Sequence, residues 1–147
     1  MDKKVFEEGG IMRERKFKGK AVNDYPSLKI KRGDWVFGYL ADEDAISVKT
    51  YMDDYGDLNC VLVQVDPETV CQYTELNDKK KQEIYEGDLV KHSDYPKNIY
   101  VVVWEYAGFM LKLIGSDDYL LCADWESELE VVGNIHDNVE MLGMQNV

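Results

Sequence analysis

The sequence predicts a mainly β protein, with strands curled into a barrel-like or strongly bent sheet and one or two short helical turns. From Lys16 onward, short runs rich in Val, Ile, Tyr and Trp are broken every eight to twelve residues by turn residues. The chain has 147 residues, 45% of them apolar, which is enough for one domain with a real core. If these many short strands formed one flat sheet, both of its faces would be exposed to solvent. The sheet is therefore expected to bend around a buried inner face.

The strands are expected where apolar and polar residues alternate. In chain order, they cover residues 17–22, 35–41, 45–51, 58–65, 70–76, 89–92, 99–106, 109–114, 119–125 and 129–135. The clearest hairpin joins the seventh and eighth of these runs through Ala107-Gly108.

Two short helical turns are expected between or after these strands. Pro67 ends a strand because proline cannot donate to a strand ladder, which places a turn at residues 66–69. A second turn is expected at residues 137–142, where Asp137 or Asn138 would cap it.

One hydrophobic core is predicted, and a glycine turn beside it. Gly87 should hold a positive φ before Asp88, because only glycine adopts that conformation without strain. The core is expected to include Trp35, Val36, Tyr73, Leu89, Val102, Trp104, Val132 and Ile135.

The charge of the chain is strongly acidic but unevenly placed. The net charge is −12; residues 1–32 carry a balance of +5, and the remaining residues one of −17. Such a field repels nucleic acid over most of the surface, so direct nucleic-acid binding is not expected. The positive end and acidic body also allow a head-to-tail homo-oligomer, which should weaken as salt rises.

The cysteines and the hydropathy indicate a cytoplasmic protein. Cys60, Cys71 and Cys122 are odd in number, form no CxxC pair and have apolar neighbours, so buried reduced thiols are expected. The chain begins without a signal-peptide pattern, and no apolar run approaches the roughly 20 residues that cross a bilayer, so no membrane association is expected.

No residue pattern predicts catalysis, and the chain is expected not to be an enzyme. P-loop, GxGxxG, GxSxG and HExxH motifs are absent from the sequence. A Cys71–His92 or a Cys122–His136 pair could form only through the fold, which leaves both open. No catalytic, cofactor-binding or metal-binding residue is therefore predicted, and no cofactor.

Two surface patterns have a structural and a functional interpretation. Asp53, Asp54 and Asp57 lack EF-hand spacing and a closing glutamate, so they are interpreted as a hairpin tip rather than a cation loop. The three tryptophans could stack nucleic-acid bases, but their apolar neighbours favour core positions.

Five ordered blocks of the chain, spanning about residues 13–142, resemble the YopX family of phage and prophage proteins. The blocks are Arg13–Gly19, Gly33–Leu40, Val65–Tyr73, the signature from Tyr73 to Lys91, and Leu129–Asn138. Three positions depart from the family pattern: Glu75 stands where glycine is usual, Lys80-Lys81 replace an Asn-Gly turn, and Val139 stands where proline is common.

The resemblance implies a β-rich pseudobarrel of mixed, folded sheet, carried by mobile elements of bacteria. No activity or catalytic residue is established for the family, so none is transferred. The expected function is that of a non-enzymatic accessory protein in the bacterial cytoplasm that binds a host or phage protein. Two alternatives stay open: an acidic decoy that mimics nucleic acid, and a small-ligand site in a barrel mouth.

The first eleven residues match nothing in the family pattern. Residues 1–11 are therefore expected to be an extension or a mis-assigned start, and residues 12–147 a single β domain beginning at Met12. Glu8-Gly9-Gly10 can be encoded by a ribosome-binding sequence just ahead of the Met12 codon, and deletion of residues 1–11 should change stability by less than about 0.5 kcal/mol.

Overall fold

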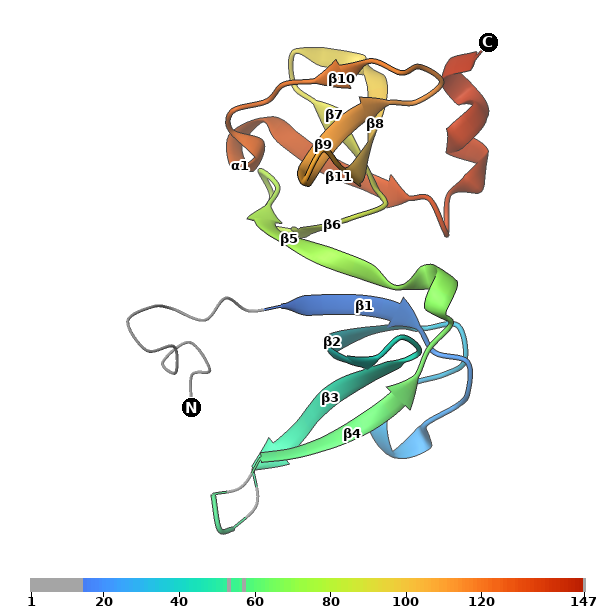
Figure 1. Cartoon of the computed structure of the whole chain (residues 1–147), viewed down its shortest axis with the longest axis vertical. Helices are drawn as coiled ribbons and strands as arrows, with labels where there is room; N and C mark the ends of the chain where they lie inside the picture. The colour runs from blue at the N-terminus through green and yellow to red at the C-terminus, as the bar shows by residue number, and fades with distance from the viewer. Residues whose placement is uncertain (1–14, 53, 57, 147) are drawn as a thin grey trace. The chain divides into compact units, whose positions relative to one another are not determined.

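The structure is a computed structural model that describes residues 15–52, 54–56 and 58–146. The chain divides into two compact units, Met1–Gln72 and Tyr73–Val147, called unit 1 and unit 2 below (Figure 1). The mainly β class is confirmed: the strands form two antiparallel sheets, which are not closed into a barrel. The proposed boundary at Met12 lies outside the described residues.

Unit 1 is an antiparallel sheet built from sequential hairpins. Its strands are β1 (Lys16–Lys20), β2 (Trp35–Asp42), β3 (Ala45–Met52) and β4 (Leu58–Gln64), with 3-10 turns η2 (Pro26–Leu28) and η3 (Pro67–Thr69). The order is β4-β3-β2-β1, followed by the first two residues of β5 (Cys71–Asn77), which pair with β1. The expected turn at 66–69 is confirmed as η3, which Asp66 caps by accepting a hydrogen bond from the Glu68 amide at 3.0 Å.

One face of the unit 1 sheet forms its hydrophobic core. The buried members are Ala21, Val36, Ile46, Val63 and Val65. Ile46 pairs with Val63 and with Leu40. Val36 lies an even number of positions from Leu40, so the buried residues of β2, β3 and β4 share one face of the sheet. At Gly38 of β2, the neighbouring strand β3 approaches so closely that there is no room for a side chain.

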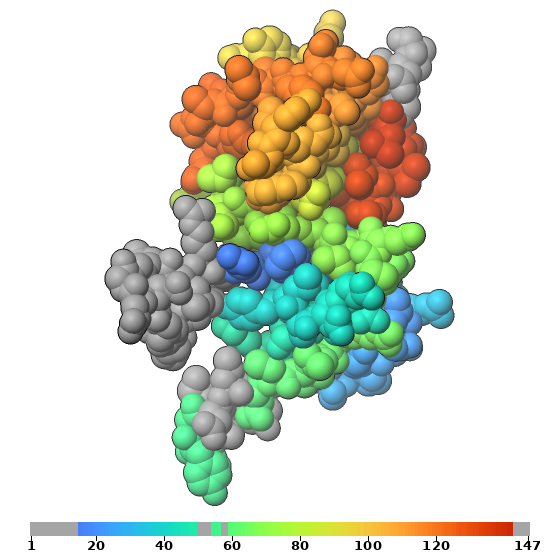
Figure 2. Space-filling model, in the orientation of Figure 1, coloured from blue at the N-terminus to red at the C-terminus, as the bar shows by residue number. Residues whose placement is uncertain are grey.

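Unit 2 contains the remainder of β5 and a five-stranded antiparallel sheet. Its elements are β6 (Glu83–Tyr85), β7 (Asp88–His92), β8 (Tyr95–Glu105), β9 (Gly108–Leu113), β10 (Tyr119–Leu120), α1 (Trp125–Glu128), β11 (Leu129–Asn134) and the 3-10 segment η4 (Val139–Asn146). The sheet order is β10-β9-β8-β7-β11, and the expected hairpin at Ala107-Gly108 joins β8 to β9. Atoms of β9 (orange) are visible at the surface of this unit in the space-filling view (Figure 2).

The prediction of one shared core is wrong. Val36 belongs to the unit 1 cluster, whereas unit 2 buries two clusters, one around Val102, Leu111 and Leu129 and another around Leu89. Most strands of each unit pair with the strand before or after them in the chain, so each sheet can bury its own inner face. Among the residues predicted as core, Trp104 is 52% exposed because it lies near the end of β8, beyond the buried part of its sheet face.

Two further expectations are corrected. The sequence predicts a strand over 119–125, but only Tyr119–Leu120 is extended and Trp125–Glu128 is helical, because Asp124 caps this turn by accepting from the Ser127 amide at 3.2 Å. Cys60 is exposed rather than buried, since it pairs with Lys49 on the sheet face opposite the core. All three cysteines are free thiols.

The departures from the family pattern at residues 75 and 81 fall on unusual backbone positions. Glu75 has φ +70 within the bulge where β5 pairs with β6, and Lys81 has φ +67 in the loop after Asp78. These are left-handed conformations that cost a side-chain-bearing residue roughly 1–2 kcal/mol. The glycines usual in the family at these places therefore have a steric explanation.

Replacement of Lys81 by glycine is expected to stabilise unit 2 by about 0.5–1 kcal/mol, because the strain at φ +67 is relieved. The neighbouring Lys79→Gly should have the opposite sign, since only the entropy of the unfolded chain changes there. Urea unfolding of both variants measures the difference, and a loss of stability in Lys81→Gly contradicts the strain.

The positive φ expected at Gly87 is confirmed, at +89. The Gly87 amide donates to the Val102 carbonyl at 2.8 Å, and its carbonyl accepts from the Ile135 amide at 2.9 Å, so the conformation is fixed from both sides. Gly87→Val is expected to cost about 1–3 kcal/mol in chemical unfolding. An unchanged unfolding midpoint would contradict this account.

No helix in the described part of the chain is long and apolar enough to cross a membrane.

Candidate functional site

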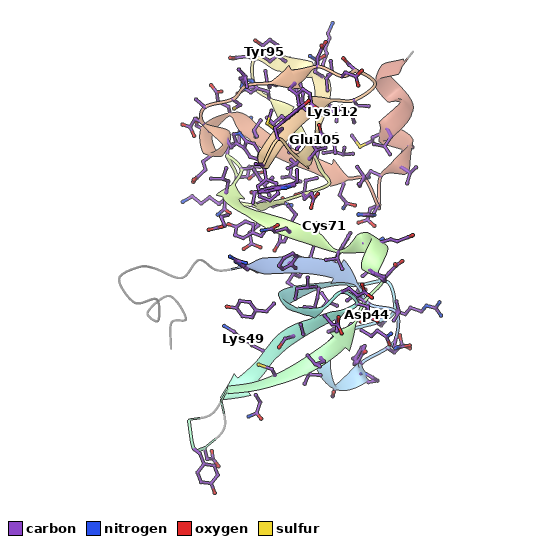
Figure 3. The ribbon with its side chains drawn as sticks, in the orientation of Figure 1. Asp44, Lys49, Cys71, Tyr95, Glu105 and Lys112 are labelled. Atoms are coloured by element: carbon purple, nitrogen blue, oxygen red, sulfur yellow. The ribbon has the colours of Figure 1, made fainter. Side chains whose placement is uncertain are left out.

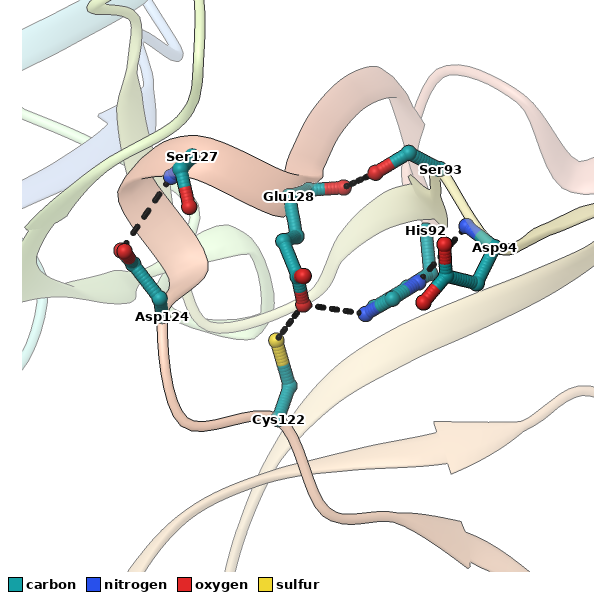
Figure 4. A network of polar contacts seen from close by, with 7 residues as sticks. All are labelled: His92, Ser93, Asp94, Cys122, Asp124, Ser127 and Glu128. Carbon is teal, nitrogen blue, oxygen red and sulfur yellow. Dashed lines mark hydrogen bonds and ion pairs between the residues drawn. The ribbon is translucent and has the colours of Figure 1, made fainter.

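Three side chains that carry chemistry meet in unit 2: His92, Cys122 and Glu128 (Figure 4). His92 ends β7 and is only 4% exposed, Glu128 ends α1, and Cys122 lies between β10 and α1. Strand pairing brings His92 close to Glu128, because His92 lies opposite Leu129, the residue after Glu128, in the β7–β11 register. The candidate ligand atoms all lie within 4.8 Å of one another.

The hydrogen bonds of the histidine ring fix where its proton lies. The Asp94 backbone amide donates to Nδ1 of His92 at 3.0 Å, so this nitrogen must offer its lone pair. The proton of a neutral ring therefore lies on Nε2, which donates to Oε2 of Glu128 at 2.7 Å. The Cys122 thiol donates to the same oxygen, with Sγ 3.6 Å away.

These proton positions do not suit a metal ion or a nucleophilic thiol. A metal at Nε2 needs the lone pair there and a proton on Nδ1, where it would face the Asp94 N–H. A nucleophilic cysteine needs a base that accepts its proton, but Nε2 of His92 is itself a donor here. Glu128 instead holds the two side chains together and fastens α1 to the end of β7, where the Ser93 amide also donates to the Glu128 carbonyl at 3.0 Å.

The thiol of Cys122 is expected to react slowly. Burial is the main cause that raises its pKa, and the Glu128 carboxylate adds to it, while the hydrogen bond with the Asp124 backbone opposes both. In a chain whose Cys60→Ser and Cys71→Ala changes leave one thiol, alkylation by iodoacetamide should reach half its maximal rate at a higher pH than for free cysteine. Because folding raises the pKa of this thiol, its contribution to the stability of the fold is lost as the pH rises through the pKa of the folded state.

Glu128→Gln is the matched control for this reaction. It keeps the size of the side chain but removes the charge, so the pH midpoint of alkylation should move down. In the single-thiol chain that keeps Glu128, a pH midpoint of alkylation at or below that of free cysteine would contradict the arrangement described.

A pocket of about 460 Å³ adjoins this cluster, entirely within unit 2. It is lined by Leu76, Phe109, Cys122, Ala123, Asp124, Trp125 and Glu126. Trp104 packs edge to face on Phe109, with ring centroids 4.8 Å apart, and extends the apolar wall to the surface. The pocket therefore combines aromatic walls with the exposed carboxylates of Asp124 and Glu126 at its rim.

The sequence left two Cys–His pairs open, and the structure favours neither. Cys122 contacts Glu128, and Cys71 donates to the Thr69 carbonyl at 3.2 Å. Glu128 was missed because no local motif marks it: it lies 36 residues from His92, and only the β7–β11 pairing brings them together. Of the acidic hairpin tip, Asp53 and Asp57 lie outside the described residues.

The comparisons with known proteins agree with the pattern of blocks in the sequence. The YopX protein family model matches residues 37–143, which is most of the chain and includes His92, Cys122 and Glu128. No curated protein matches the chain with significant similarity. Since the match extends over both compact units, the chain belongs to the YopX protein family.

Proposed function

We propose that the chain is a non-enzymatic accessory protein of a phage or prophage that acts in the bacterial cytoplasm by binding another protein. The observation that carries the proposal is the aromatic and acidic pocket of unit 2. The neighbouring polar cluster supports it, because burial and the Glu128 carboxylate raise the pKa of the Cys122 thiol, and Nε2 of His92 donates to Glu128 rather than acting as a base.

The lining of the pocket indicates the chemistry of the partner. Aromatic side chains such as Trp125 and Phe109 give large contact areas at little entropic cost and dominate binding energy at protein interfaces. Asp124 and Glu126 at the rim favour a cation, and aromatic faces attract one as well. A surface lysine or arginine of the partner, next to an apolar side chain, matches this combination.

The charge of unit 2 points the same way. Residues 73–147 carry fifteen Asp/Glu against six Lys/Arg, so the partner approaches a strongly negative surface. Such a field speeds the encounter with a basic protein, and the gain falls as salt screens it.

A photo-crosslinking amino acid at Ala123 tests the pocket directly, because this exposed residue lines it. In host cells, adducts are expected from position 123 and not from Lys91, an exposed control position on β7. Trp125→Ala with Glu126→Gln should abolish the adduct. Equal adducts from position 91, or adducts that survive the double change, would overturn the proposal.

The other candidates are outcomes of the same experiment. Release of the captured protein by duplex DNA would favour the acidic decoy, since the two would then share a binding site. A small-ligand site in a barrel mouth has no place in the described sheets, which are not closed, so a ligand would have to use this open pocket. Sedimentation of the purified chain at low and high salt shows whether it forms a homo-oligomer in the absence of any partner protein.

A further inference from the structure

Lysines and aromatic residues alternate on the face of the unit 1 sheet that lies opposite its hydrophobic core. Three lysines of β1 lie directly across from three aromatic residues of β2 in the antiparallel register. The pairs are Lys16 with Tyr39, Lys18 with Phe37 and Lys20 with Trp35. These six residues, with Lys49 of the next strand, are called the basic–aromatic face.

The ammonium groups of this face lie close to its rings. Nζ of Lys18 is 4.4 Å from the ring centroid of Trp35, and Nζ of Lys20 is 5.3 Å from the same ring. Nζ of Lys49, which extends from β3 (Figure 3), is 5.2 Å from the ring centroid of Tyr39. Each distance is within the range of a cation–π contact. Lys18 is only 7% exposed, so its contact with Trp35 lies within the unit, whereas Lys49 is exposed and presents charge beside the Tyr39 ring at the surface.

Part of this face is open and hollowed. A pocket of about 200 Å³ is lined by Lys16, Phe37, Gly38, Tyr39, Ser47, Val48 and Lys49. Phe37 is 46% exposed, and Lys49 is exposed as well. The volume is below the usual range for a whole small ligand, and it suits a single flat ring of a longer molecule.

The local charge differs from that of the whole chain. The strands β1 to β4 contain one carboxylate, Asp42 at the end of β2, although the net charge of the protein is −12. The other acidic residues that the structure describes in unit 1 therefore lie outside these strands, and the sheet face itself is positive.

We propose that the basic–aromatic face binds single-stranded nucleic acid, a function beyond the protein contact assigned to unit 2. Successive bases stack on Phe37 and Tyr39, and Lys16 and Lys49 contact the flanking phosphates. Rings at alternate positions of one strand are roughly 7 Å apart, so successive unstacked bases can use them in turn. A duplex keeps its bases paired and stacked, and its denser charge is repelled more strongly by the acidic remainder of the protein.

Fluorescence anisotropy with the full chain and a labelled twelve-nucleotide single strand tests the proposal, using RNA and DNA in parallel. At 50 mM salt we expect a Kd between about 1 and 100 µM, with a matched duplex weaker by at least tenfold. Phe37→Ala should weaken binding by about 5- to 100-fold, as expected for the loss of one stacking ring. Tyr55→Ala, which removes a ring that is 90% exposed on the β3–β4 hairpin, should leave it unchanged.

The salt dependence gives a second measurement that does not depend on the aromatic variant folding. Lys49→Gln should reduce the slope of log Kd against log salt by about 0.7, the value for one phosphate contact on a single strand. Lys31→Gln, an exposed lysine of the same unit outside the face, should leave the slope unchanged. Absence of binding at 50 mM salt, equal binding of the duplex, equal competition by polyglutamate, or an unchanged slope in Lys49→Gln would each overturn the proposal.

Discussion

Asp78→Ala is expected to destabilise unit 2 by about 3–5 kcal/mol, a large loss for a single polar side chain. The carboxylate of Asp78 is 2% exposed and accepts three backbone hydrogen bonds. Oδ1 accepts from the amides of Lys80 and Gln82 at 2.8 and 2.9 Å, and Oδ2 accepts from the Val131 amide at 2.9 Å. Alanine leaves all three donors without this acceptor and removes the side-chain link from the loop to β11, while the hydrogen bond from the Lys79 amide to the Leu129 carbonyl remains.

Two controls make the origin of this loss measurable in urea unfolding. Asp78→Asn keeps an acceptor oxygen on one side but turns an N–H toward a backbone donor on the other, which leaves about one hydrogen bond unmade. Its loss of unfolding free energy should therefore be smaller than that of Asp78→Ala but still above about 1 kcal/mol. Asp117→Ala removes an exposed carboxylate and should stay within about 0.5 kcal/mol. A stability of Asp78→Ala equal to that of Asp117→Ala would refute the role of this loop.

Gly38→Ala is expected to cost at least about 3 kcal/mol or to prevent unit 1 from folding. A Cβ atom at this position would lie 2.2 Å from the carbonyl oxygen of Ser47 and 3.0 Å from a side-chain carbon of Ile46. The oxygen belongs to the backbone of β3 and cannot rotate away, so β2 and β3 must separate. The separation would open the cluster around Ile46, which is fully buried.

Gly108→Ala is the matched control, because a Cβ atom there meets nothing within 4 Å. Its stability should change by less than about 0.5 kcal/mol. Hydrogen exchange resolved by mass spectrometry assigns the effect: faster exchange in β2 and β3 is expected for Gly38→Ala. Unchanged protection of these strands would contradict the close approach.

The sequence predicted what depends on neighbouring residues. The β8–β9 hairpin follows from strong alternation around Ala107-Gly108, and η3 follows from Asp66 and Pro67. The positive φ of Gly87 is likewise a property of one turn. Each of these features belongs to a turn whose residue types favour it, so local chemistry suffices to predict it, although hydrogen bonds to Val102 and Ile135 also hold the conformation of Gly87.

The sequence also marked positions that it could not explain. Glu75 and Lys81 stood out only as departures from the family pattern, and their backbone angles give the reason. Asp78 looked like one polar residue of a loop, whereas its buried carboxylate joins that loop to β11, 53 residues further on. A hydrogen bond at that separation leaves no local signature.

By itself, the sequence determined the mainly β class, the family, and the absence of a recognisable catalytic motif, because periodicity and short blocks are carried by adjacent residues. The three-dimensional packing was needed to see that the apolar residues form separate clusters rather than one core. The same holds for the contact of His92 with Glu128 and for the three lysines that lie across from three aromatic residues. These features depend on which strands pair and in which register, and strand pairing is fixed by contacts between residues distant in the chain, which sum over the whole sheet.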